Sequence, residues 1–361
     1  MISVNKEIFP KDLIFKKNYR LKEMLTNEFN NIENNIKVLS VVGTNGKGST
    51  TLMLSEGMKT QYKKVGMFIS PAFLFHNERV QINNEYITDE EIKNILDEYN
   101  SIIRKYELTY FEIWTFIGII HFTNNNVEVA IIEAGIGGKF DSTNVFENQL
   151  AVIVTSISID HINILGNKIE DIIDQKIGIW KGKSKIFVAN SNKKYKKYFD
   201  QKNIEFIFAD ESNSNNIFDR DNRGLVECVF NNFNLKVDLS INKLLGRMTI
   251  LKSKPLLLID GAHNIDALEK LAITISDVEK PLILIGLSDL SKVQMCKNIF
   301  KDNEYLFVNF ESEKSVDLSN QKNFTNDWKK TVRDNLHRNI IATGSLYFLP
   351  LIVEEFGNGD T

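Results

Sequence analysis

The sequence predicts an α/β protein with a doubly wound, mostly parallel sheet in its N-terminal part and a smaller α/β unit at its C-terminal end. Short β-branched runs alternate with segments of helical composition, a pattern typical of parallel sheets covered by helices. A glycine-rich turn, GTNGKGST, stands between the first strand-like run and a helix. A second alternating series begins at Pro255. We therefore expect two domains, residues 1–248 and 249–361.

The strands expected in the first domain are short, apolar and rich in Val and Ile. They cover residues 36–42, 65–69, 127–132, 152–155 and 185–189. The helices around them carry apolar residues on one face or are apolar throughout. They are expected at residues 21–29, 50–61, 111–122 and 169–180, and one more opens at Thr88, where Thr-Asp-Glu-Glu forms a capping box.

Residues 190–245 are rich in Asn, Asp and Ser and show the weakest pattern of the chain. Only weak strands are expected there, at residues 204–208, 226–230 and 235–239. The second domain alternates again, with strands at PLLLID, PLILIGL, EYLFVNF and IIATGS, a helix from Ile265 and a last helix near the end. We place the boundary between the two domains near residues 247–254.

The composition narrows the range of functions. The 47 acidic and 44 basic residues leave a formal net charge of −3, so no global attraction to nucleic acid or to an anionic membrane is expected. The longest apolar run, residues 113–122, is too short for a membrane span, which needs about 20 residues. The first residues show no apolar core of a secretion signal. Two cysteines, Cys228 and Cys296, predict neither a disulfide framework nor a metal cluster, and we expect a cytoplasmic protein.

The strongest functional signal is the run GTNGKGST at residues 43–50. Its glycines let the backbone wrap around phosphate oxygens, and its N–H groups can bind the anion together with the start of the following helix. Lys47 can neutralise the terminal phosphates, and Ser49 or Thr50 can face a phosphate or a magnesium ion. The spacing differs from the general phosphate-loop pattern, because Val41 stands where that pattern has its first glycine. The alternative is a plain tight turn.

Two further polar residues follow strands that are expected beside this loop. Glu133 ends an apolar run, and a carboxylate at that point suits a magnesium ligand. His161 comes with Asp160 after the next strand and could reach the same metal, because loops after parallel strands gather at one edge of a sheet. Either side chain could instead be an ordinary surface group, and the residues alone leave both alternatives open.

Two other segments carry chemistry only in context. Lys176 and Lys181 lie in the helical segment DQKIGIWKGK, where solvated surface lysines are the simplest interpretation. Asp260 and His263 stand in IDGAHN, directly after a strand of the second domain. Such a pair can hold a ribose, a phosphate or a metal, or the segment can simply begin a helix with an Asn cap.

Ten segments in order resemble the folylpolyglutamate synthase and dihydrofolate synthase branch of the Mur ligase superfamily. They are VVGTNGKGST, SP at 70–71, ERVQINNEYIT, TYFEIWT, IIEAGIGGKFDSTN, SISIDHINILG, DQKIGIWKGK, GRM at 246–248, IDGAHN and ATGSLY. Apart from the loop each is weak alone, but all ten in the family order are very specific. The resemblance implies a Mur-ligase-like ATP-binding domain with a phosphate loop, followed by a Rossmann-like ligase domain.

The resemblance also implies how ATP is bound. The triphosphate is expected at the glycine-rich loop, on Thr44, Asn45, Gly46, Lys47, Gly48, Ser49 and Thr50. The ATP contacts of the family's second domain match Arg247, Asp260 and His263. In the family arrangement ATP would lie between the domains, and their closure would complete the site.

Metal ligands and catalytic residues are implied in the same way. Ser70 and Glu133 match the ligands of one Mg²⁺, and Glu133 and His161 match those near a second. Lys176 matches the family's carbamylated lysine, whose added carboxylate can ligate that second metal; an unmodified ammonium would repel it. Lys47, Lys176 and His161 are therefore the expected catalytic residues.

The implied reaction is the ATP-dependent joining of L-glutamate to a reduced folate. A folate carboxylate attacks the γ-phosphate of ATP to give an acyl phosphate and ADP, and the glutamate amine then displaces phosphate. Phe111, with Glu112 beside it, matches the family's aromatic contact to the pterin ring. The expected partners are these small molecules, with no nucleic acid and no membrane, and the family suggests a monomer.

The chain departs from the family pattern in three places. Residues 190–246 form a short segment in which the family's ATP-contacting Asn cannot be assigned. Ala72 and Phe73 stand where the family usually has His-Leu. The first 36 residues lack the usual pattern, and that region helps to bind pteroate in dihydrofolate synthases. These departures bear on the use of dihydropteroate more than on glutamate ligation.

Three other functions stay open. Another Mur-type ligase could join an amino acid to a different carboxylate, but ERVQINNEYIT and TYFEIWT match the folate branch. A nucleotide-binding relative without catalysis would fit the shortened middle, but the intact Lys47, Glu133, His161, Lys176 and His263 argue against it. A phosphate-loop kinase or GTPase is disfavoured by the C-terminal unit and by the absence of a guanine-reading motif.

Overall fold

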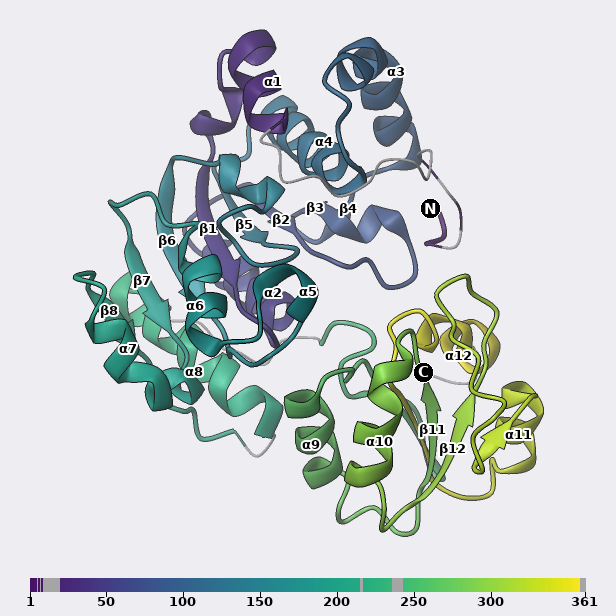
Figure 1. Cartoon of the computed structure of the whole chain (residues 1–361). Coiled ribbons are helices and arrows are strands. Elements are labelled where there is room, and N and C mark those ends of the chain that lie inside the picture. Colours follow the sequence, from purple (N-terminus) through teal and green to yellow (C-terminus); the bar gives the residue numbers. More distant parts are fainter. Residues whose placement is uncertain (5, 7, 9–19, 215–216, 236–242, 358–361) are drawn as a thin grey trace. The chain divides into compact units, whose positions relative to one another are not determined.

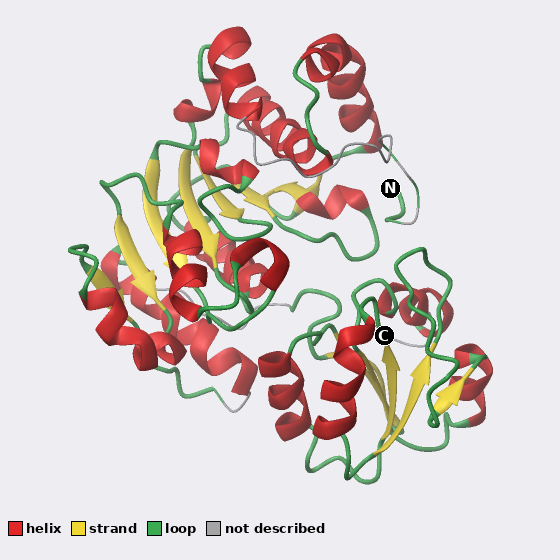
Figure 2. Ribbon diagram, viewed as in Figure 1, coloured by secondary structure: helices red, strands yellow, loops and turns green. Residues whose placement is uncertain are grey.

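The computed structural model describes residues 1–4, 6, 8, 20–214, 217–235 and 243–357. The chain divides into two compact units, Met1–Ile241 and Asn242–Thr361, and each is a sheet covered by helices (Figures 1 and 2). The observed division lies after Ile241, a few residues before the expected domain boundary after residue 248. The described residues 243–248 therefore group with the second unit.

The first unit is built on an eight-stranded sheet with the order β4-β3-β2-β5-β1-β6-β7-β8. Its strands are β1 (Lys37–Val42), β2 (Val65–Phe68), β3 (Val80–Ile82), β4 (Glu85–Tyr86), β5 (Val129–Glu133), β6 (Gln149–Val154), β7 (Lys185–Val188) and β8 (Phe206–Phe208). Strands β2, β5, β1, β6, β7 and β8 are parallel, whereas β3 and β4 add an antiparallel edge. The predicted doubly wound, mostly parallel sheet is confirmed.

Helices cover both faces of this sheet (Figure 2). They are α1 (Arg20–Phe29), α2 (Lys47–Met58), α3 (Asp89–Lys105), α4 (Tyr110–Asn124), α5 (Ile162–Leu165), α6 (Ile169–Ile177), α7 (Lys196–Asp200) and α8 (Ile217–Asn232). Side chains of β1 alternate between the two faces: Leu39 and Val41 enter a core with α2 and α8, and Val38 enters a core with α1, α3 and α4. Both faces of the central strands are therefore buried, as their nearly continuous apolar sequence requires.

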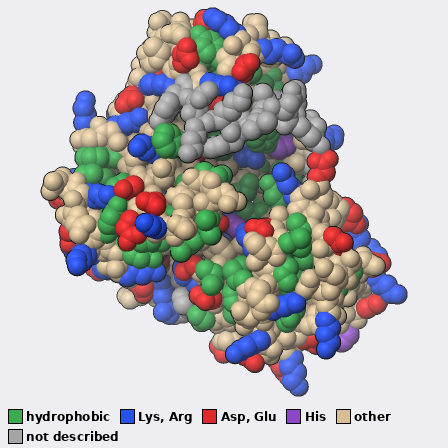
Figure 3. Space-filling model, viewed as in Figure 1, with side chains coloured by type: hydrophobic (Ala, Val, Ile, Leu, Met, Phe, Trp, Pro, Cys, Tyr) green, Lys and Arg blue, Asp and Glu red, His purple; other side chains and the backbone are tan. Residues whose placement is uncertain are grey.

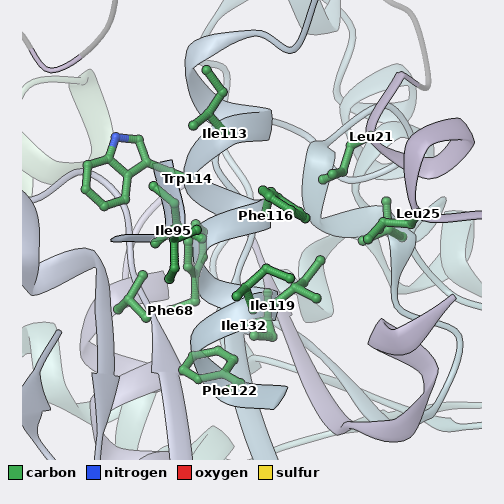
Figure 4. Close-up of a cluster of buried hydrophobic side chains, with 14 of the residues drawn as sticks. Leu21, Leu25, Phe68, Ile95, Ile113, Trp114, Phe116, Ile119, Phe122 and Ile132 are labelled. Carbon is green, nitrogen blue, oxygen red and sulfur yellow. The ribbon is translucent and has the colours of Figure 1, made fainter. Parts of the chain in front are cut away.

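Helices α3 and α4 begin at the same kind of cap. The Thr88 hydroxyl accepts from the Glu91 N–H and the Glu91 carboxylate accepts from the Thr88 N–H, so the predicted capping box is confirmed. Thr109 and Glu112 repeat it at the start of α4. Helix α4 lies in the apolar cluster of Figure 4, where Trp114, Phe116 and Phe122 are among the buried side chains.

The prediction of a strand at residues 226–230 is wrong, because this stretch lies in helix α8. Its buried residues are Leu225, Val226, Val229 and Phe230, a spacing of one helical face that packs on the sheet. The apolar run was too short for its period to be distinguished from that of a strand. The strand expected at 204–208 is confirmed as β8, and the one at 235–239 lies outside the described residues except for Leu235.

The second unit contains a six-stranded sheet with the order β13-β12-β11-β14-β10-β9. Its strands are β9 (Thr249–Ser253), β10 (Leu256–Asp260), β11 (Leu282–Gly286), β12 (Glu304–Val308), β13 (Phe324–Thr325) and β14 (Ile340–Thr343), and its helices are α9 (Ile265–Thr274), α10 (Val293–Ile299), α11 (Trp328–Asp334) and α12 (Leu349–Phe356). Only β9 is antiparallel to its neighbour among these strands. The predicted smaller α/β unit is confirmed.

Candidate functional site

Three neighbouring parallel strands of the first unit end at one edge of the sheet. Strand β1 lies between β5 and β6, with Val41 opposite Glu133 and Val42 opposite Val154. The chain connects β1 to β2 and β5 to β6 by crossing over a neighbouring strand in each case. Such a switch point opens a crevice at the carboxyl ends of the strands. The glycine-rich loop, Glu133 and the loop that carries His161 all start from this edge.

The glycine-rich loop needs its glycines at two positions. Gly43 has φ 151° and Gly46 has φ 87°, conformations that side chains with a Cβ rarely adopt. At Gly43 an added Cβ would also lie 1.8 Å from Oγ1 of Thr155. Helix α2 begins at Lys47, directly after the second glycine. The loop therefore presents backbone N–H groups and a helix N-terminus, which together suit an anion.

The loop after β6 is hydrogen bonded to the glycine-rich loop. The Thr44 N–H donates to the Ser156 carbonyl at 2.7 Å, and the Thr44 hydroxyl donates to the Ser158 carbonyl at 3.0 Å. His161 follows shortly afterwards, exposed and with φ 48°, and its N–H donates to Asp160 Oδ1. These bonds fix the start of the loop that carries His161 beside the expected phosphate site.

Asn222 is a site residue that the sequence interpretation missed. It lies on α8, is 9% exposed, and its Oδ1 atom would be 2.2 Å from a Cβ placed on Gly46. The side-chain amide of Asn222 therefore occupies the space that a side chain at Gly46 would need. The strand expected nearby covered residues 226–230, and the apolar run there is too short for its period to indicate the helix that carries Asn222.

Glu133 and Ser70 are brought together at the end of β5. Glu133 is 3% exposed, and its Oε2 atom accepts from the Ser70 N–H at 3.0 Å. Ser70 follows β2, the other neighbour of β5, and precedes a cis bond to Pro71. A carboxylate next to a hydroxyl, at the rim of a phosphate-binding loop, is a donor set that magnesium accepts when phosphate oxygens complete its shell.

Lys176 is buried at 2% exposure rather than solvated. Its Nζ atom donates to the Gly43 carbonyl at 2.7 Å, in the glycine-rich loop. Burial, the largest cause, and the charge of Lys47 together lower the pKa of Lys176 from 10.5 to about 7, although Asp160 and Asp141 act in the opposite direction. The side chain is therefore poised between a neutral amine and an ammonium at neutral pH. Lys181, in contrast, pairs with Glu147 near the surface.

Phe111 and Glu112 are adjacent on α4 but have different surroundings. The Phe111 ring lies over Gly135, where an added Cβ would be 2.7 Å from it and 3.3 Å from Oδ2 of Asp141. Glu112 is buried, and its carboxylate accepts from Thr109 and from the Leu21 N–H. The contacts of Glu112 thus hold helix α4, and its role in substrate binding stays a prediction.

In the second unit, Arg247, Asp260 and His263 lie around the end of β10. The Asp260 carboxylate accepts from the N–H groups of Met248 and Ala262. Burial raises the pKa of Asp260, and the charge of Arg247 acts in the opposite direction. The Nδ1 atom of His263 is 2.8 Å from the Gly261 carbonyl. Asn264 caps helix α9, so the segment does begin a helix with an Asn cap, one of the two alternatives considered for it. The three residues predicted for this unit are brought together.

No three His, Cys, Asp or Glu side chains lie close enough to hold a metal ion by themselves in the part of the chain that the structure describes. A metal at Ser70 and Glu133 would thus need oxygen ligands from a bound substrate, as magnesium with ATP commonly does.

None of the helices among the described residues is long and apolar enough to cross a membrane. Acidic and basic side chains are mixed over the face shown in Figure 3.

Comparisons with known proteins agree with this architecture. Residues 41–250, more than half of the chain, match the Mur ligase middle domain. The dihydrofolate synthase/folylpolyglutamate synthase of Bacillus subtilis is 38% identical over 169 residues, which cover 45% of this chain and 39% of that relative. The matched part is thus less than half of the relative's length.

Solved structures show the same fold over nearly the whole chain. Folylpolyglutamate synthase from Thermotoga maritima is 22% identical with a TM-score of 0.79, over 96% of this chain and 94% of that one. The bifunctional folylpolyglutamate synthase/dihydrofolate synthase from Yersinia pestis, solved with AMPPNP and a Mn ion, is 21% identical with a TM-score of 0.82, over 96% and 95% of the two chains.

The buried Lys176 predicts a pH dependence of stability. The pKa of Lys176 is about 7 in the folded chain, against an ordinary lysine value of 10.5. The unfolded state therefore binds more protons between these pH values, and stability rises with pH across that window. We expect the free energy of unfolding of the wild type to gain about 1 kcal/mol per pH unit relative to Lys176→Met above pH 7. Urea unfolding in CO₂-free buffers at pH 7 and pH 9 measures this difference.

Lys181→Met is the matched control, because Lys181 lies near the surface in the same segment of the chain. This control should keep the wild-type difference between the two pH values. An equal pH dependence in wild type and Lys176→Met would contradict a lowered pKa for Lys176.

Proposed function

The chain belongs to the Mur ligase family, and on that premise we propose that it is an ATP-dependent ligase that joins L-glutamate to a reduced folate. The proposal rests on one observation. Lys47, Ser70, Glu133 and the buried Lys176 converge on the glycine-rich loop at the carboxyl ends of β1 and β5. This is a site for transferring the terminal phosphate of ATP to a carboxylate. The choice of folate as the acceptor rests on the names of the relatives, which include folylpolyglutamate and dihydrofolate synthases.

The loop fits the triphosphate of ATP. The N–H groups of residues 43–50 and the N-terminus of α2 would bind the phosphate oxygens, and Lys47 at the first position of α2 would offset the charge of the terminal phosphate. The Thr50 hydroxyl is buried without a hydrogen-bond partner in the described structure, so it is available to bond a phosphate oxygen. The Yersinia pestis relative was solved with an ATP analogue, which supports the assignment.

We propose that Ser70, Glu133 and His161 would hold two magnesium ions. Ser70 and Glu133 would hold the first ion, and Glu133 and His161 would hold the second, with phosphate oxygens completing both shells. Bound magnesium would supply charge neutralisation of the phosphates during phosphoryl transfer. Glu133 is suited to serve both ions because it ends the strand next to the glycine-rich loop.

The chain's own groups would act in sequence on the acceptor. Lys47 and the loop N–H groups would orient the γ-phosphate, so that a carboxylate oxygen of the folate attacks it in line and ADP leaves. The acyl phosphate so formed has a good leaving group. The amine of L-glutamate then attacks its carbonyl carbon, forming the amide bond as phosphate departs and the amine loses a proton. Phe111, over Gly135, would hold the folate ring system.

We further propose that Lys176 is carbamylated. With a pKa of about 7, a large share of the side chain is a neutral amine at neutral pH, and its lone pair can attack CO₂, form an N–C bond and release a proton. The product is a carboxylate at a buried position beside the Gly43 carbonyl. This conversion replaces a cation that would repel magnesium by an anion that can ligate the second ion.

Asn222 is proposed as the ATP-contacting Asn that could not be assigned from the sequence. It is the α8 side chain that packs on Gly46 of the phosphate loop. Arg247, Asp260 and His263 keep their predicted roles as ATP contacts of the second unit. We also propose that the protein acts as a monomer in the cytoplasm.

The proposed function predicts a product heavier than the folate acceptor by one glutamyl unit. The assay contains MgATP, L-glutamate and a reduced folate, with a parallel reaction on dihydropteroate, and mass spectrometry reads the products. Lys47→Met should lower the rate by about 10²- to 10³-fold because it removes a charge that stabilises the transferred phosphate.

Lys59→Met is the control variant, since Lys59 lies at the other end of α2 and pairs with Glu56. Product from folate alone would indicate a dedicated polyglutamylase, and product from both acceptors a bifunctional enzyme. If neither acceptor gains glutamate while ATP still binds, the folate assignment is wrong and another carboxylate or a relative without catalysis takes its place.

Carbamylation predicts that activity depends on CO₂ through Lys176. Protein exchanged into CO₂-free buffer should lose activity and recover it when bicarbonate is added, and ¹³C-bicarbonate should produce a carbamate NMR signal that Lys176→Met lacks. We expect Lys176→Met to be about 10- to 100-fold less active, as for a lost group that tunes a metal. A full rate without CO₂, or the same ¹³C signal in the variant, would disprove the carbamate.

The position of Asn222 predicts a specific loss of nucleotide affinity. Asn222→Ala should weaken binding of a non-hydrolysable ATP analogue by about 10-fold, the value of one hydrogen bond to a charged group. Asn232→Ala, at the far end of the same helix and exposed, should bind the analogue like the wild type. Calorimetric titration measures both, and equal affinities for all three proteins would remove Asn222 from the site.

A further inference from the structure

The segment ERVQINNEYIT has no role in the function described so far, although it contains a buried arginine. Arg79 ends the short helical turn His76–Arg79 and is 7% exposed. A guanidinium stays charged at all physiological pH values, and burying it requires partners that replace water. The contacts of Arg79 therefore show what it is placed to bind.

The described residues provide only some of the hydrogen-bond partners that the Arg79 guanidinium needs. Its Nη1 atom lies 3.4 Å from Oγ of Ser70, a long hydrogen bond. Its carbon Cζ lies 5.7 Å from the ring centroids of Tyr110 and Trp114 on α4, a cation–π arrangement. The buried Nε–H has no hydrogen-bond partner in the described structure. Aromatic faces and one distant hydroxyl thus leave the Nε–H donor without an acceptor among the described residues.

The acidic residue that precedes Arg79 in the sequence is already engaged. The Glu78 carboxylate accepts from the N–H groups of Phe73, Leu74 and Phe75 at 2.6 to 2.9 Å. Across the described ranges, no carboxylate forms an ion pair with Arg79. His76 adds no second positive charge here, since burial and the charge of Arg79 lower its pKa to about 4 and keep the imidazole neutral. The positive charge has no counter-ion from this part of the chain.

Ser70 connects this charge to the proposed reaction site. Its N–H donates to Glu133, while its hydroxyl faces Arg79. On the Glu133 side the proposed metals and the γ-phosphate would bind. On the Arg79 side the local charge is positive and the walls are aromatic. A carboxylate that is to attack the γ-phosphate must lie between these two environments.

We propose that Arg79 binds the carboxylate end of the folate acceptor and holds it beside Ser70. The inference rests on the proposed function and deepens it, because it names the guanidinium of Arg79 as the group that binds the negative charge of the acceptor. The planar fork of a guanidinium matches the two oxygens of a carboxylate, and the aromatic walls suit the apolar part of the same molecule. Phe111, one residue after Tyr110 on α4, would hold the ring system at the other end.

The test separates charge recognition from folding. Wild type, Arg79→Gln and Arg79→Lys are titrated with a reduced folate and with the same folate whose glutamyl carboxylates are converted to primary amides, both in the presence of a non-hydrolysable ATP analogue and magnesium. We expect the wild type to bind the acid about 10-fold or more tighter than the amide. Arg79→Gln should lose this preference while its affinity for the amide stays at the wild-type value, and Arg79→Lys should keep part of it.

Arg104→Gln is the matched control, because Arg104 is exposed on α3 and donates to Asn100. The inference is overturned if Arg79→Gln keeps the preference for the acid, if it weakens acid and amide alike, or if it weakens only the ATP analogue. If Arg79→Gln does not fold, the ratio of acid affinity to amide affinity measured for Arg79→Lys provides the test instead. If the wild type itself binds no folate but binds the ATP analogue, the proposed function fails and this inference falls with it, an outcome distinct from an unchanged ratio in a working ligase.

Discussion

The parallel alignment of β5, β1 and β6 is the constraint on which the whole site depends. Because Val41 lies opposite Glu133 and Val42 opposite Val154, three connections leave the sheet at the same height. One is the glycine-rich loop, one follows Glu133, and one leads to His161. The buried apolar faces of the three strands keep their ends together, so packing energy remote from the site fixes the positions of its polar groups.

Lys176 shows how this arrangement tolerates a buried cation. A lysine buried at 2% exposure is costly in its charged form, and the Gly43 carbonyl satisfies only one of its donors among the contacts described. The chain reduces this cost by letting the amine become neutral near pH 7. The same property that limits the energetic penalty gives the amine its nucleophilic character. Stability and chemistry therefore depend on one proton at this position.

Most of the fold could be predicted from the sequence, because the strands are short Val and Ile runs and the glycine-rich turn marks the first crossover. The ends of strands also pointed to Glu133 and His161. Asn222 could not be found in this way, because its helix carries an apolar run too short to reveal its period, and its approach to Gly46 is a tertiary contact. Arg79 was missed for a related reason: its burial against Tyr110 and Trp114 depends on the packing of α4. For Glu112, the pattern Thr-x-x-Glu already contained the cap that the structure shows.

The contact between Asn222 of α8 and Gly46 couples the position of a helix to the shape of the glycine-rich loop. The amide of Asn222 fills the volume above a glycine whose backbone must stay bare, so the helix and the loop form one template. Helix α8 is held on the sheet by its buried apolar face. A substitution that loosens this face would also move the amide of Asn222 away from Gly46. Apolar packing on the sheet therefore fixes the shape of the glycine-rich loop from outside the loop itself.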